Sequence, residues 1–432
     1  MSEAVSGLLG DAGPAIPGPP PGREAQRPDH RLPPGQWVRH NLFDGVANSV
    51  LTVVFGVLLL WVAYRLARFV LVSAEWEVVR RNLRLFLVGR FPSDQLWRLW
   101  AAGGLLVVAV GFSFGAAAER TVAARPELPP PERRPARVLI GGVHRFWPLL
   151  LGVAVLLSLT RTVGPTLLVA GGVVALVLAR FAGPPAAARL GRWWWLVPAS
   201  LAIASFQVIT ARGGVGWDDW GGLMLTVFVT VAGIVLAFPA GLVLALGRRS
   251  RLPVIRWLSI AYIELFRGVP LITLLFLGQF VIFFMFPSYL APPGLLVRAL
   301  IAIVLFESAY VAEVVRGGLQ AVSKGQYEAA QALGLSPFAM MRRIVLPQAL
   351  RAVIPALVGQ FISLFKDTSL LSIIGILELL RVASAVVTQP DFLGQGLDAV
   401  TLSFAGFLYW VGCYTMSKES RRIERRVGEA RR

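Results

Sequence analysis

Long apolar stretches separated by short polar segments occupy most of the chain. A helix needs roughly 20 apolar residues to cross a bilayer, and ten stretches approach or reach that length: 48–72, 97–117, 146–161, 165–181, 193–210, 220–247, 257–287, 295–316, 348–372 and 396–416. The pattern predicts an all-α polytopic membrane protein with about eight to ten transmembrane helices. The stretches 146–161 and 165–181 are the weakest, because the first is short, and they could instead form a re-entrant pair.

The region before the first apolar stretch, 1–41, differs in composition. It is rich in proline and contains no apolar run, so we expect neither a buried core nor a cleavable secretory signal. The prediction is a disordered Pro-rich cytoplasmic tail, with a docking ligand for another protein as the alternative. Ionisable residues become frequent within the spans only in the second half of the chain. This predicts accessory transmembrane helices over 42–211, a core domain over 217–416 and a basic cytoplasmic tail over 417–432.

Composition excludes two classes of protein. The 432 residues are 56% hydrophobic and only 15% charged, whereas soluble domains are about 45–50% apolar and about 25% charged, which excludes a soluble enzyme. Cys413 is the only cysteine, which excludes a disulfide-stapled secreted module. The formal net charge of +18 does not indicate nucleic-acid binding, because the arginines lie in short segments between apolar stretches rather than along one helix face.

The distribution of basic residues orients the spans, because cytoplasmic loops carry an excess of Lys and Arg. Three segments are basic: 248–256, the loop 317–347, and the C-terminal tail after Met416. Placing these three in the cytoplasm puts the N-terminus there as well, and the segment 213–219 outside. The segment 73–95 fits poorly, since the same count places it outside although it contains several arginines.

The polar loop 317–347 is the most informative segment of the chain. From Glu328 onward it consists of strong helix formers, and Glu328 is expected near the N-terminus of a short helix, where the helix dipole favours an acidic side chain. Gly334 can adopt the left-handed conformation that ends a helix. Ser336 is a favoured N-cap and Pro337 suits the first position of a second helix. We therefore expect a compact helix–Gly–helix unit that fits a groove of another protein, the alternative being a plain structural turn.

The spacing within this loop resembles the coupling loop of ABC importer permeases. The matching positions are Glu328-Ala329-Ala330, three residues, Gly334, nine residues, and Ile344-x-Leu346-Pro347. Four further blocks resemble the polar amino acid branch of these permeases, which includes the histidine, glutamine, glutamate and arginine permeases: 220–226, 262–272, 310–320 and 365–370. The segment 86–98 looks like the longer M-type permease of general L-amino acid ABC importers. Outside that segment the resemblance covers about 217–426, and it implies a type I ABC importer permease core of five to six helices.

The resemblance also implies partners. Such an importer combines two permease subunits, here expected to be homologous but non-identical, with a cytoplasmic ABC ATPase dimer and a periplasmic amino-acid-binding protein in the bacterial inner membrane. This chain would form the translocation pathway for polar or general L-amino acids. It would couple to the ATPase through Glu328, Ala329, Ala330, Gly334, Leu346 and Pro347. Membrane lipid is a further expected partner, and nucleic acid is not.

The sequence carries no catalytic or cofactor-binding pattern. None of its lysines (Lys324, Lys366 and Lys418) follows a glycine, so a P-loop for ATP cannot be written. ATP and Mg²⁺ are therefore expected only in the partner ATPase. The three histidines lack the spacing of metal ligands. We expect no enzymatic activity, no metal and no cofactor bound by this chain.

Ionisable side chains within the expected spans are candidates for the transport pathway, because such groups are costly to expose to lipid. Glu264 and Arg267 lie three residues apart, as do Glu313 and Arg316, so each pair shares one helix face near the cytoplasmic end of its span. These residues are expected either to hold an inner gate or to form local ion pairs.

Three more candidates lie deeper in the spans. Lys366 and Asp367 are far along the ninth stretch, where they could contact a zwitterionic substrate, lock an outer gate or pair with a neighbouring subunit. Glu307, within the eighth stretch, is the single residue most expected to face the pore.

Two other classes of protein compete with the importer interpretation. An ion-coupled secondary amino acid transporter acting alone would show internal repeats and broken helices, and no convincing repeat relates the two halves of the sequence. A membrane scaffold would recruit its partners through the Pro-rich tail. For the importer, much of the substrate selectivity is expected in the binding protein, which is another chain.

Overall fold

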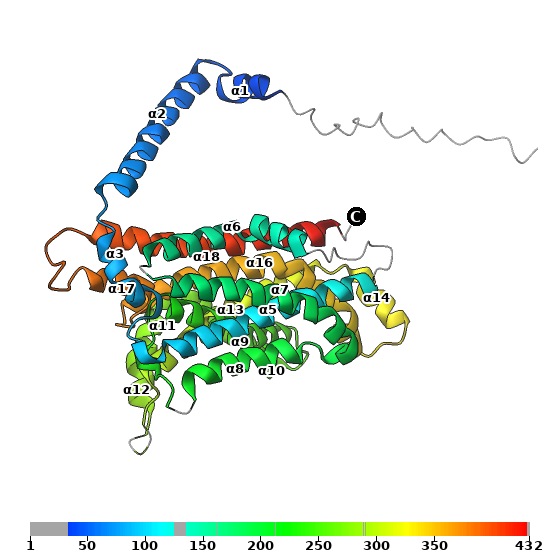
Figure 1. The fold of residues 1–432 in the computed structure, drawn as a ribbon. Helices are drawn as coiled ribbons and strands as arrows, with labels where there is room; N and C mark the ends of the chain where they lie inside the picture. The colour runs from blue at the N-terminus through cyan, green and yellow to red at the C-terminus, as the bar shows by residue number, and fades with distance from the viewer. Residues whose placement is uncertain are drawn as a thin grey trace, which may run out of the picture. The chain divides into compact units, whose positions relative to one another are not determined.

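The computed structural model of the chain is helical and describes residues 33–124, 135–160, 162–211, 213–287, 289 and 291–429. Among these residues the only β-type pairing is an isolated bridge between Gly222 and Glu378. The chain divides into two compact units, Met1–Ala74 and Glu75–Arg432. Figure 1 shows the helices and labels many of them.

The first unit contains helix α1 (Pro34–Leu42), helix α2 (Val46–Arg68) and the π-helical turn η1 (Phe69–Ser73). The expected disorder of 1–41 is wrong for 34–41, which belong to α1, and the residues before 33 lie outside the described part. A proline in the first helical turn has no need of the N–H that it lacks, so Pro34 allows the helix to begin there. No residue of α2 is buried within the protein, as expected for an apolar helix that faces lipid.

The N-terminal part of the second unit consists of α3 (Glu77–Arg81), α4 (Leu83–Val88), η2 (Ser93–Gln95), α5 (Leu96–Ala124), α6 (Pro135–Leu159), α7 (Gly164–Leu190), η3 (Gly191–Trp193) and α8 (Leu196–Thr210). Glycines let α5 and α7 pack closely, since a Cβ on Gly115 would lie 2.1 Å from the carbonyl oxygen of Arg180. A Cβ on Gly183 would likewise lie 2.5 Å from the carbonyl oxygen of Phe112. Small residues at such contacts are typical of helices that associate in a membrane.

The remainder of the second unit consists of η4 (Trp217–Asp219), α9 (Gly222–Arg248), α10 (Pro253–Gly268), α11 (Leu271–Phe276), η5 (Leu277–Val281), α12 (Ile282–Met285), α13 (Leu295–Ala321), α14 (Lys324–Ala332), α15 (Pro337–Met340), η6 (Met341–Val345), α16 (Leu346–Asp367), η7 (Thr368–Ser372), α17 (Leu379–Val386) and α18 (Asp398–Glu429). Helix α13 is central, because it packs against α9, α10, α11 and α16. The predicted basic tail continues α18 as far as Glu429.

All ten apolar stretches are helical, and most are long enough to span a membrane. Within the described residues, seven helices have the length and apolar composition of a membrane span, or eight if α10 and α11–α12, bent by 103°, are counted as one. The bend falls at Pro270, which has no N–H to continue the helix. Two further apolar helices are shorter, Arg145–Leu159 and Leu196–Thr210. The expected eight to ten spans are confirmed at the lower end of that range, and five of them lie in 217–416.

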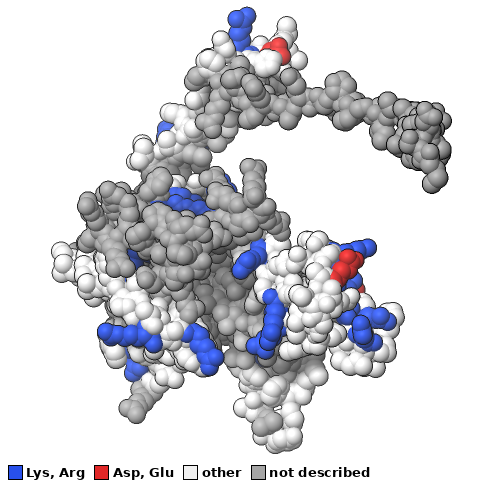
Figure 2. Space-filling view, turned by 90° about the vertical axis from the view of Figure 1, so that its right-hand side faces the viewer, with Lys and Arg blue, Asp and Glu red and all other residues white. Residues whose placement is uncertain are grey.

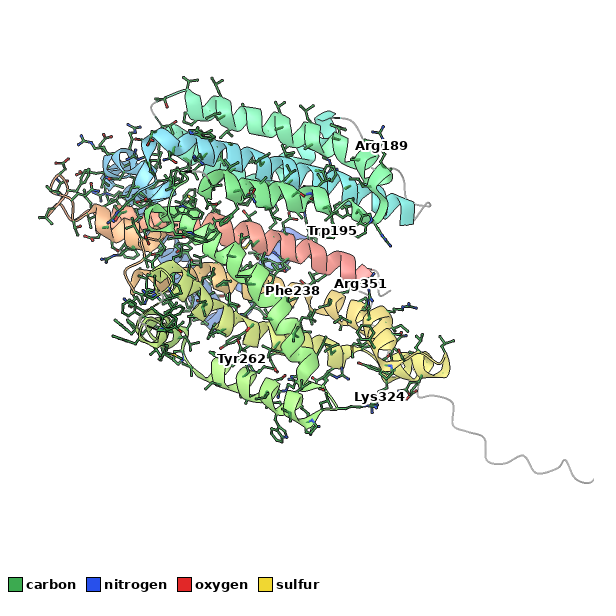
Figure 3. The ribbon with its side chains drawn as sticks, turned by 90° about the horizontal axis from the view of Figure 1, so that it is seen from below. Arg189, Trp195, Phe238, Tyr262, Lys324 and Arg351 are labelled. Atoms are coloured by element: carbon green, nitrogen blue, oxygen red, sulfur yellow. The ribbon has the colours of Figure 1, made fainter. Side chains whose placement is uncertain are left out.

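Basic residues gather at the end of the second unit that carries α14 (Figure 2). Figure 3 shows Arg189, Lys324 and Arg351 toward the same end, although they come from α7, α14 and α16. Figure 2 looks onto the end that carries α14 and shows more Lys and Arg than Asp and Glu on the described residues of that end. The basic character of this end agrees with the positive-inside pattern on which the orientation of the spans was based.

The segment 73–95 lies at the end opposite α14. Its Gly89 packs against Gly221, since a Cβ on Gly89 would lie 2.4 Å from the Cα of Gly221. Asn82 accepts a hydrogen bond from Gln389 at 3.0 Å. The segment therefore lies at the end that the span count requires despite its arginines. Two of these, Arg80 and Arg81, pair with Glu77 at 3.7 and 3.1 Å, which offsets part of the charge.

The accessory helices are attached to the core at both ends, so Glu75–Arg432 forms one unit. At the end opposite α14 the contact is made by α4, whose Phe86 is buried against Phe404 of α18 with ring centres 5.1 Å apart. At the other end Arg145 of α6 pairs with Glu419 of α18, with Nε and Oε1 2.9 Å apart. The functional division between 42–211 and 217–416 stays a prediction.

Candidate functional site

Helix α14 and the turn after it form the predicted helix–Gly–helix unit. Gly334 has a φ of +71°, and its N–H donates to the carbonyl of Gln331 at 2.9 Å. The next N–H, of Leu335, donates to the carbonyl of Ala330 at 3.1 Å. Together these bonds form a Schellman motif, which requires the left-handed residue that glycine supplies. One detail of the prediction is wrong: α14 begins at Lys324, so Glu328 lies in its second turn, away from the helix N-terminus.

The second helix begins as the sequence predicts. The hydroxyl of Ser336 accepts a hydrogen bond from the N–H of Ala339 at 3.3 Å, and Pro337 occupies the first helical turn. The five residues Met341–Val345 form a π-helical turn before Leu346 and Pro347. A proline lacks an N–H and its ring clashes with the carbonyl four residues earlier in a regular α-helix. The wider π turn therefore explains how the chain continues through Pro347 into α16.

The exposed surface of this unit is partly apolar. Glu328 and Ala329 are exposed, whereas Ala330 is 1% exposed within a cluster of buried residues that includes Val345. The side chains of Leu333 and Phe338, on either side of Gly334, are 78% and 73% exposed. Our sequence reasoning missed these two residues; the available signal was two large apolar side chains in a polar loop. The tip of the unit therefore presents two large apolar side chains on its surface.

Arg249 connects α14 to the end of α9. Its guanidinium donates to the hydroxyl of Tyr327 at 3.1 Å and to the carbonyl of Leu319 at 3.4 Å. The same guanidinium lies 5.7 Å from the centre of the Tyr327 ring. Gln326 of α14 also accepts a hydrogen bond from Gln348 of α16 at 3.0 Å. A displacement of α14 would therefore act on α9, α13 and α16 together.

The gate candidates form one network rather than two local pairs. Glu313 pairs with Arg316, with Nε and Oε2 2.9 Å apart, and also with Arg248 and Arg267, each at 3.7 Å. Glu264 pairs with Arg248 at 3.0 Å. The alternative of a local ion pair between Glu264 and Arg267 is not seen among the described residues, because Arg267 reaches across to Glu313 on α13. Arg248 was not singled out from the sequence, where it belongs to an ordinary basic loop.

The remaining pathway candidates lie away from this network. Glu307 is 1% exposed, and one of its carboxylate oxygens accepts a hydrogen bond from Gln360 of α16 at 3.1 Å. Its other oxygen has no hydrogen-bond partner within the described residues. Lys366 is exposed at the end of α16, Asp367 is half-buried, and no ion pair joins the two in the described part of the chain.

A second buried carboxylate, Glu378, lies at the end opposite α14. Its oxygens accept hydrogen bonds from the N–H groups of Leu380 (2.8 Å) and Arg381 (2.6 Å) and from the hydroxyl of Tyr409 (2.9 Å). Glu378 thus caps α17 and joins it to α18. Burial raises the pKa of this carboxyl to about 7. The three hydrogen bonds act in the opposite direction but do not cancel the effect of burial. The sequence signal we missed is an acidic residue directly before an apolar helical run.

Metal-binding side chains do not cluster within the described part of the chain. Among the residues that the structure describes, no group of three or more His, Cys, Asp and Glu side chains is arranged to hold a metal ion.

Comparisons with known proteins support the family. The model of the binding-protein-dependent transport system inner membrane component matches residues 237–428. The inner membrane amino-acid ABC transporter permease protein YhdY of Escherichia coli is 32% identical over 415 residues, covering 91% of this chain and 93% of YhdY. The glutamate/glutamine/aspartate/asparagine transport system permease protein BztC of Rhodobacter capsulatus is 34% identical over 432 residues, covering 91% of this chain and 93% of BztC. The crystal structure of an amino acid ABC transporter with histidines shares 31% identity over 47% of this chain and 90% of that chain, with a TM-score of 0.42.

The structure defines the class of a polytopic membrane protein, a bundle of apolar helices with the exposed α14–Gly334–α15 unit at one end. Both full-length relatives match this chain over its accessory helices as well as its core. The chain belongs to the binding-protein-dependent transport system inner membrane components, and within them to the amino-acid permeases of ABC transporters.

Proposed function

We propose that this chain forms the amino-acid translocation pathway of an ABC importer and couples it to a separate ATPase through α14, Gly334 and α15. The observation that carries the proposal is the exposed tip of this unit, where Leu333 and Phe338 project on either side of a Gly334 held by the Schellman motif. Exposed apolar side chains on a short rigid helix are what a groove in a partner protein binds.

The proposed complex contains two permease subunits, a cytoplasmic ATPase dimer and a periplasmic amino-acid-binding protein, in the lipid of a bacterial inner membrane. In this proposal both termini of the chain and α14 face the cytoplasm, and for α14 the excess of Lys and Arg at its end supports this orientation (Figure 2). ATP and Mg²⁺ are bound by the ATPase and no cofactor by this chain. Closure of the ATPase dimer would displace α14, and the attached ends of α9, α13 and α16 would tilt as a body.

The network around Glu313 is proposed as part of the inner gate. It joins α9, α10 and α13 through Arg248 and Arg267, so a tilt of one helix must change at least one ion pair. Glu307 is proposed to face the translocation pathway through its unpartnered oxygen when α13 and α16 separate. Lys366 and Asp367 are proposed to act at the outer gate or at the second permease subunit.

The experiment that tests this function is purification of the chain from its native membrane in mild detergent, followed by mass spectrometry of the proteins that accompany it. Recovery of a P-loop ATPase and a second permease supports the importer. Recovery of this chain alone, from a preparation in which other membrane complexes stay intact, contradicts it. Ion-driven uptake by proteoliposomes of the lone chain would then identify a secondary transporter.

A further inference from the structure

A cavity of about 270 Å³ lies at the end of the second unit opposite α14. Charged, aromatic and backbone groups line it together: Arg90, Trp217, Asp218, Trp220, Gly375 and Arg381. Leu296, in the first turn of α13, also lines it, whereas α14 follows the last turn of the same helix. Helix α13 has 27 residues and is therefore about 40 Å long. The cavity and the docking unit lie at its opposite ends.

The backbone that carries Arg90 is held in place by close packing. Gly89 has a φ of +65° and lies against Gly221, so that neither residue leaves room for a Cβ. Three residues earlier, Phe86 is fully buried. The position of Arg90 relative to the start of α9 is therefore set by direct backbone contact.

The other charged groups of the cavity are also on supported backbone. The N–H of Arg381 is held by the buried carboxylate of Glu378 at 2.6 Å. Asp218 follows Trp217 in the sequence, and the ring of Trp217 stacks on that of Trp220 with centres 5.5 Å apart. The indole N–H of Trp220 donates to the carbonyl of Val215 at 3.2 Å. A site on supported backbone loses less entropy when it binds a ligand.

The charges of the cavity define the ligand that would complement it. Arg90 and Arg381 supply two guanidinium groups, which bind carboxylates in a bidentate geometry. Asp218 supplies one carboxylate, and the indole of Trp217 offers a face that attracts an ammonium group. An acidic amino acid carries the complementary set of two carboxylates and one ammonium group. The volume lies just below the roughly 300–1,000 Å³ of sites for drug-sized ligands, which suits a small molecule.

We propose that this cavity binds an acidic L-amino acid, with its two carboxylates on Arg90 and Arg381 and its ammonium group between Asp218 and Trp217. The proposal rests on the proposed transport function. It adds a substrate class and a substrate-binding site at the outer end of the permease. Arg90 and both tryptophans lie before residue 237, where the match to the family model begins. Arg90, one of the two arginines proposed to bind the carboxylates, thus belongs to the accessory region.

Direct binding tests the site. The complex that contains this chain is purified in lipid nanodiscs without any binding protein, and binding of radiolabelled L-glutamate is measured in competition with L-aspartate, L-glutamine and glutarate. We expect L-aspartate to compete with L-glutamate, and L-glutamine to bind about 10-fold or more weakly, because it lacks one charged group. Arg90→Gln and Arg381→Gln should each weaken L-glutamate binding about 10-fold or more. Asp218→Asn should weaken binding of L-glutamate but not of glutarate, which has no ammonium group.

Matched variants control for charge and folding. Arg84→Gln removes an exposed arginine from the same segment, and Asp219→Asn changes the carboxyl next to Asp218; neither residue lines the cavity, so both variants should bind as the wild type does. If Arg90→Gln lowers the thermal stability of the complex, Arg90→Lys keeps the charge and loses the bidentate contact, and it should bind with intermediate affinity.

Three results would overturn the site. They are wild-type binding of L-glutamine as tight as that of L-glutamate, cavity variants that bind L-glutamate normally, and cavity variants that weaken only the capture of the periplasmic binding protein. Uptake of amino acids by intact cells is measured in parallel. ATP-driven uptake with no L-glutamate binding to the complex would reject the site and leave the importer standing, whereas loss of the ATPase partner would reject the proposed function itself.

Discussion

Arg249 donates a hydrogen bond to the hydroxyl of Tyr327 at 3.1 Å, and this contact joins the end of α9 to the exposed helix α14. The preceding residue, Arg248, pairs with Glu264 and Glu313. Two adjacent arginines thus connect the docking unit on one side to the ion-pair network on the other. A displacement of α14 has a short physical route to the helices that would open and close the pathway.

The first prediction concerns this contact. Arg249→Ala removes the hydrogen bonds to Tyr327 and Leu319 and the cation–π contact. Tyr327→Phe keeps the ring but removes the hydroxyl, which accepts from Arg249 and donates to the carbonyl of Leu319 at 3.3 Å. Each hydrogen bond is worth about 1 kcal/mol. We expect transport per ATP hydrolysed to fall in both variants, and more in Arg249→Ala. Uptake and ATPase activity are measured on the same reconstituted complex. Arg251→Ala, in the same basic loop, is the control, and an equal effect of all three would argue against a specific link.

The second prediction concerns the turn. Gly334→Asp, and Glu328→Lys on the exposed face of α14, should abolish uptake while the protein stays in the membrane. Gly334→Ala should cost about 1 kcal/mol through strain at φ +71°. Gly325→Ala, in the same helix at an ordinary backbone conformation, should be neutral or slightly stabilising. Uptake and the amount of membrane-inserted protein are compared, and normal uptake with Gly334→Asp and Glu328→Lys would contradict the coupling role.

The third prediction compares two carboxylates of the network. Glu313→Gln leaves Arg248, Arg267 and Arg316 without their shared partner, so it should lower the stability of the complex by about 1–3 kcal/mol and reduce uptake. Glu264 is 56% exposed, and within the described residues its one ion pair is with Arg248, so Glu264→Gln should have an effect of less than about 1 kcal/mol. Thermal unfolding in detergent, with uptake in parallel, separates the two. A larger effect of Glu264→Gln would contradict the central position of Glu313.

The fourth prediction is a pH dependence that arises at Glu378. Its pKa of about 7 in the folded protein lies above the ordinary value of 4.5, so the folded state binds the proton more tightly than the unfolded state. Protonation of Glu378 therefore adds to the free energy of unfolding, in full below about pH 4.5. This contribution, at most about 3 kcal/mol, is lost as the pH rises to about 7. The unfolding temperature should therefore be higher at pH 5 than at pH 8. Glu378→Gln should reduce this difference, whereas Asp391→Asn, an exposed carboxyl at the same end, should preserve it.

Local features were predicted well because they depend on neighbouring residues. The ten apolar stretches became helices because apolar length is a property of the segment itself. Gly334 ends α14 and Ser336 caps α15 for the same reason, since each satisfies backbone groups within a few residues. The start of α14 was misplaced because polar residues from Lys324 to Tyr327 continue a helix as readily as they precede one. The helix that begins at Pro34 was not predicted, because prolines are typical of disordered tails and also of the first turn of a helix.

The partners of the charged side chains could not be predicted in this way. Glu264 and Arg267 share a helix face, yet Arg267 pairs with Glu313 because the packing of α10 on α13 brings them together. Arg249 and Tyr327 are far apart in the sequence, and only the meeting of two helix ends makes them neighbours. The burial of Glu378 could not be predicted either, because it results from the packing of α17 and α18 around this carboxylate.

The sequence by itself determined the class of the protein, the helical segments and the docking loop, because hydrophobic length, backbone caps and residue spacing act over a few neighbouring positions. The tertiary structure alone decided which residues of the loop are exposed, how the gate candidates pair and that Arg90 meets Arg381 around one cavity. These relationships depend on the packing of helices that are far apart in the sequence, and close approach at small residues such as Gly89 and Gly221 contributes to that packing.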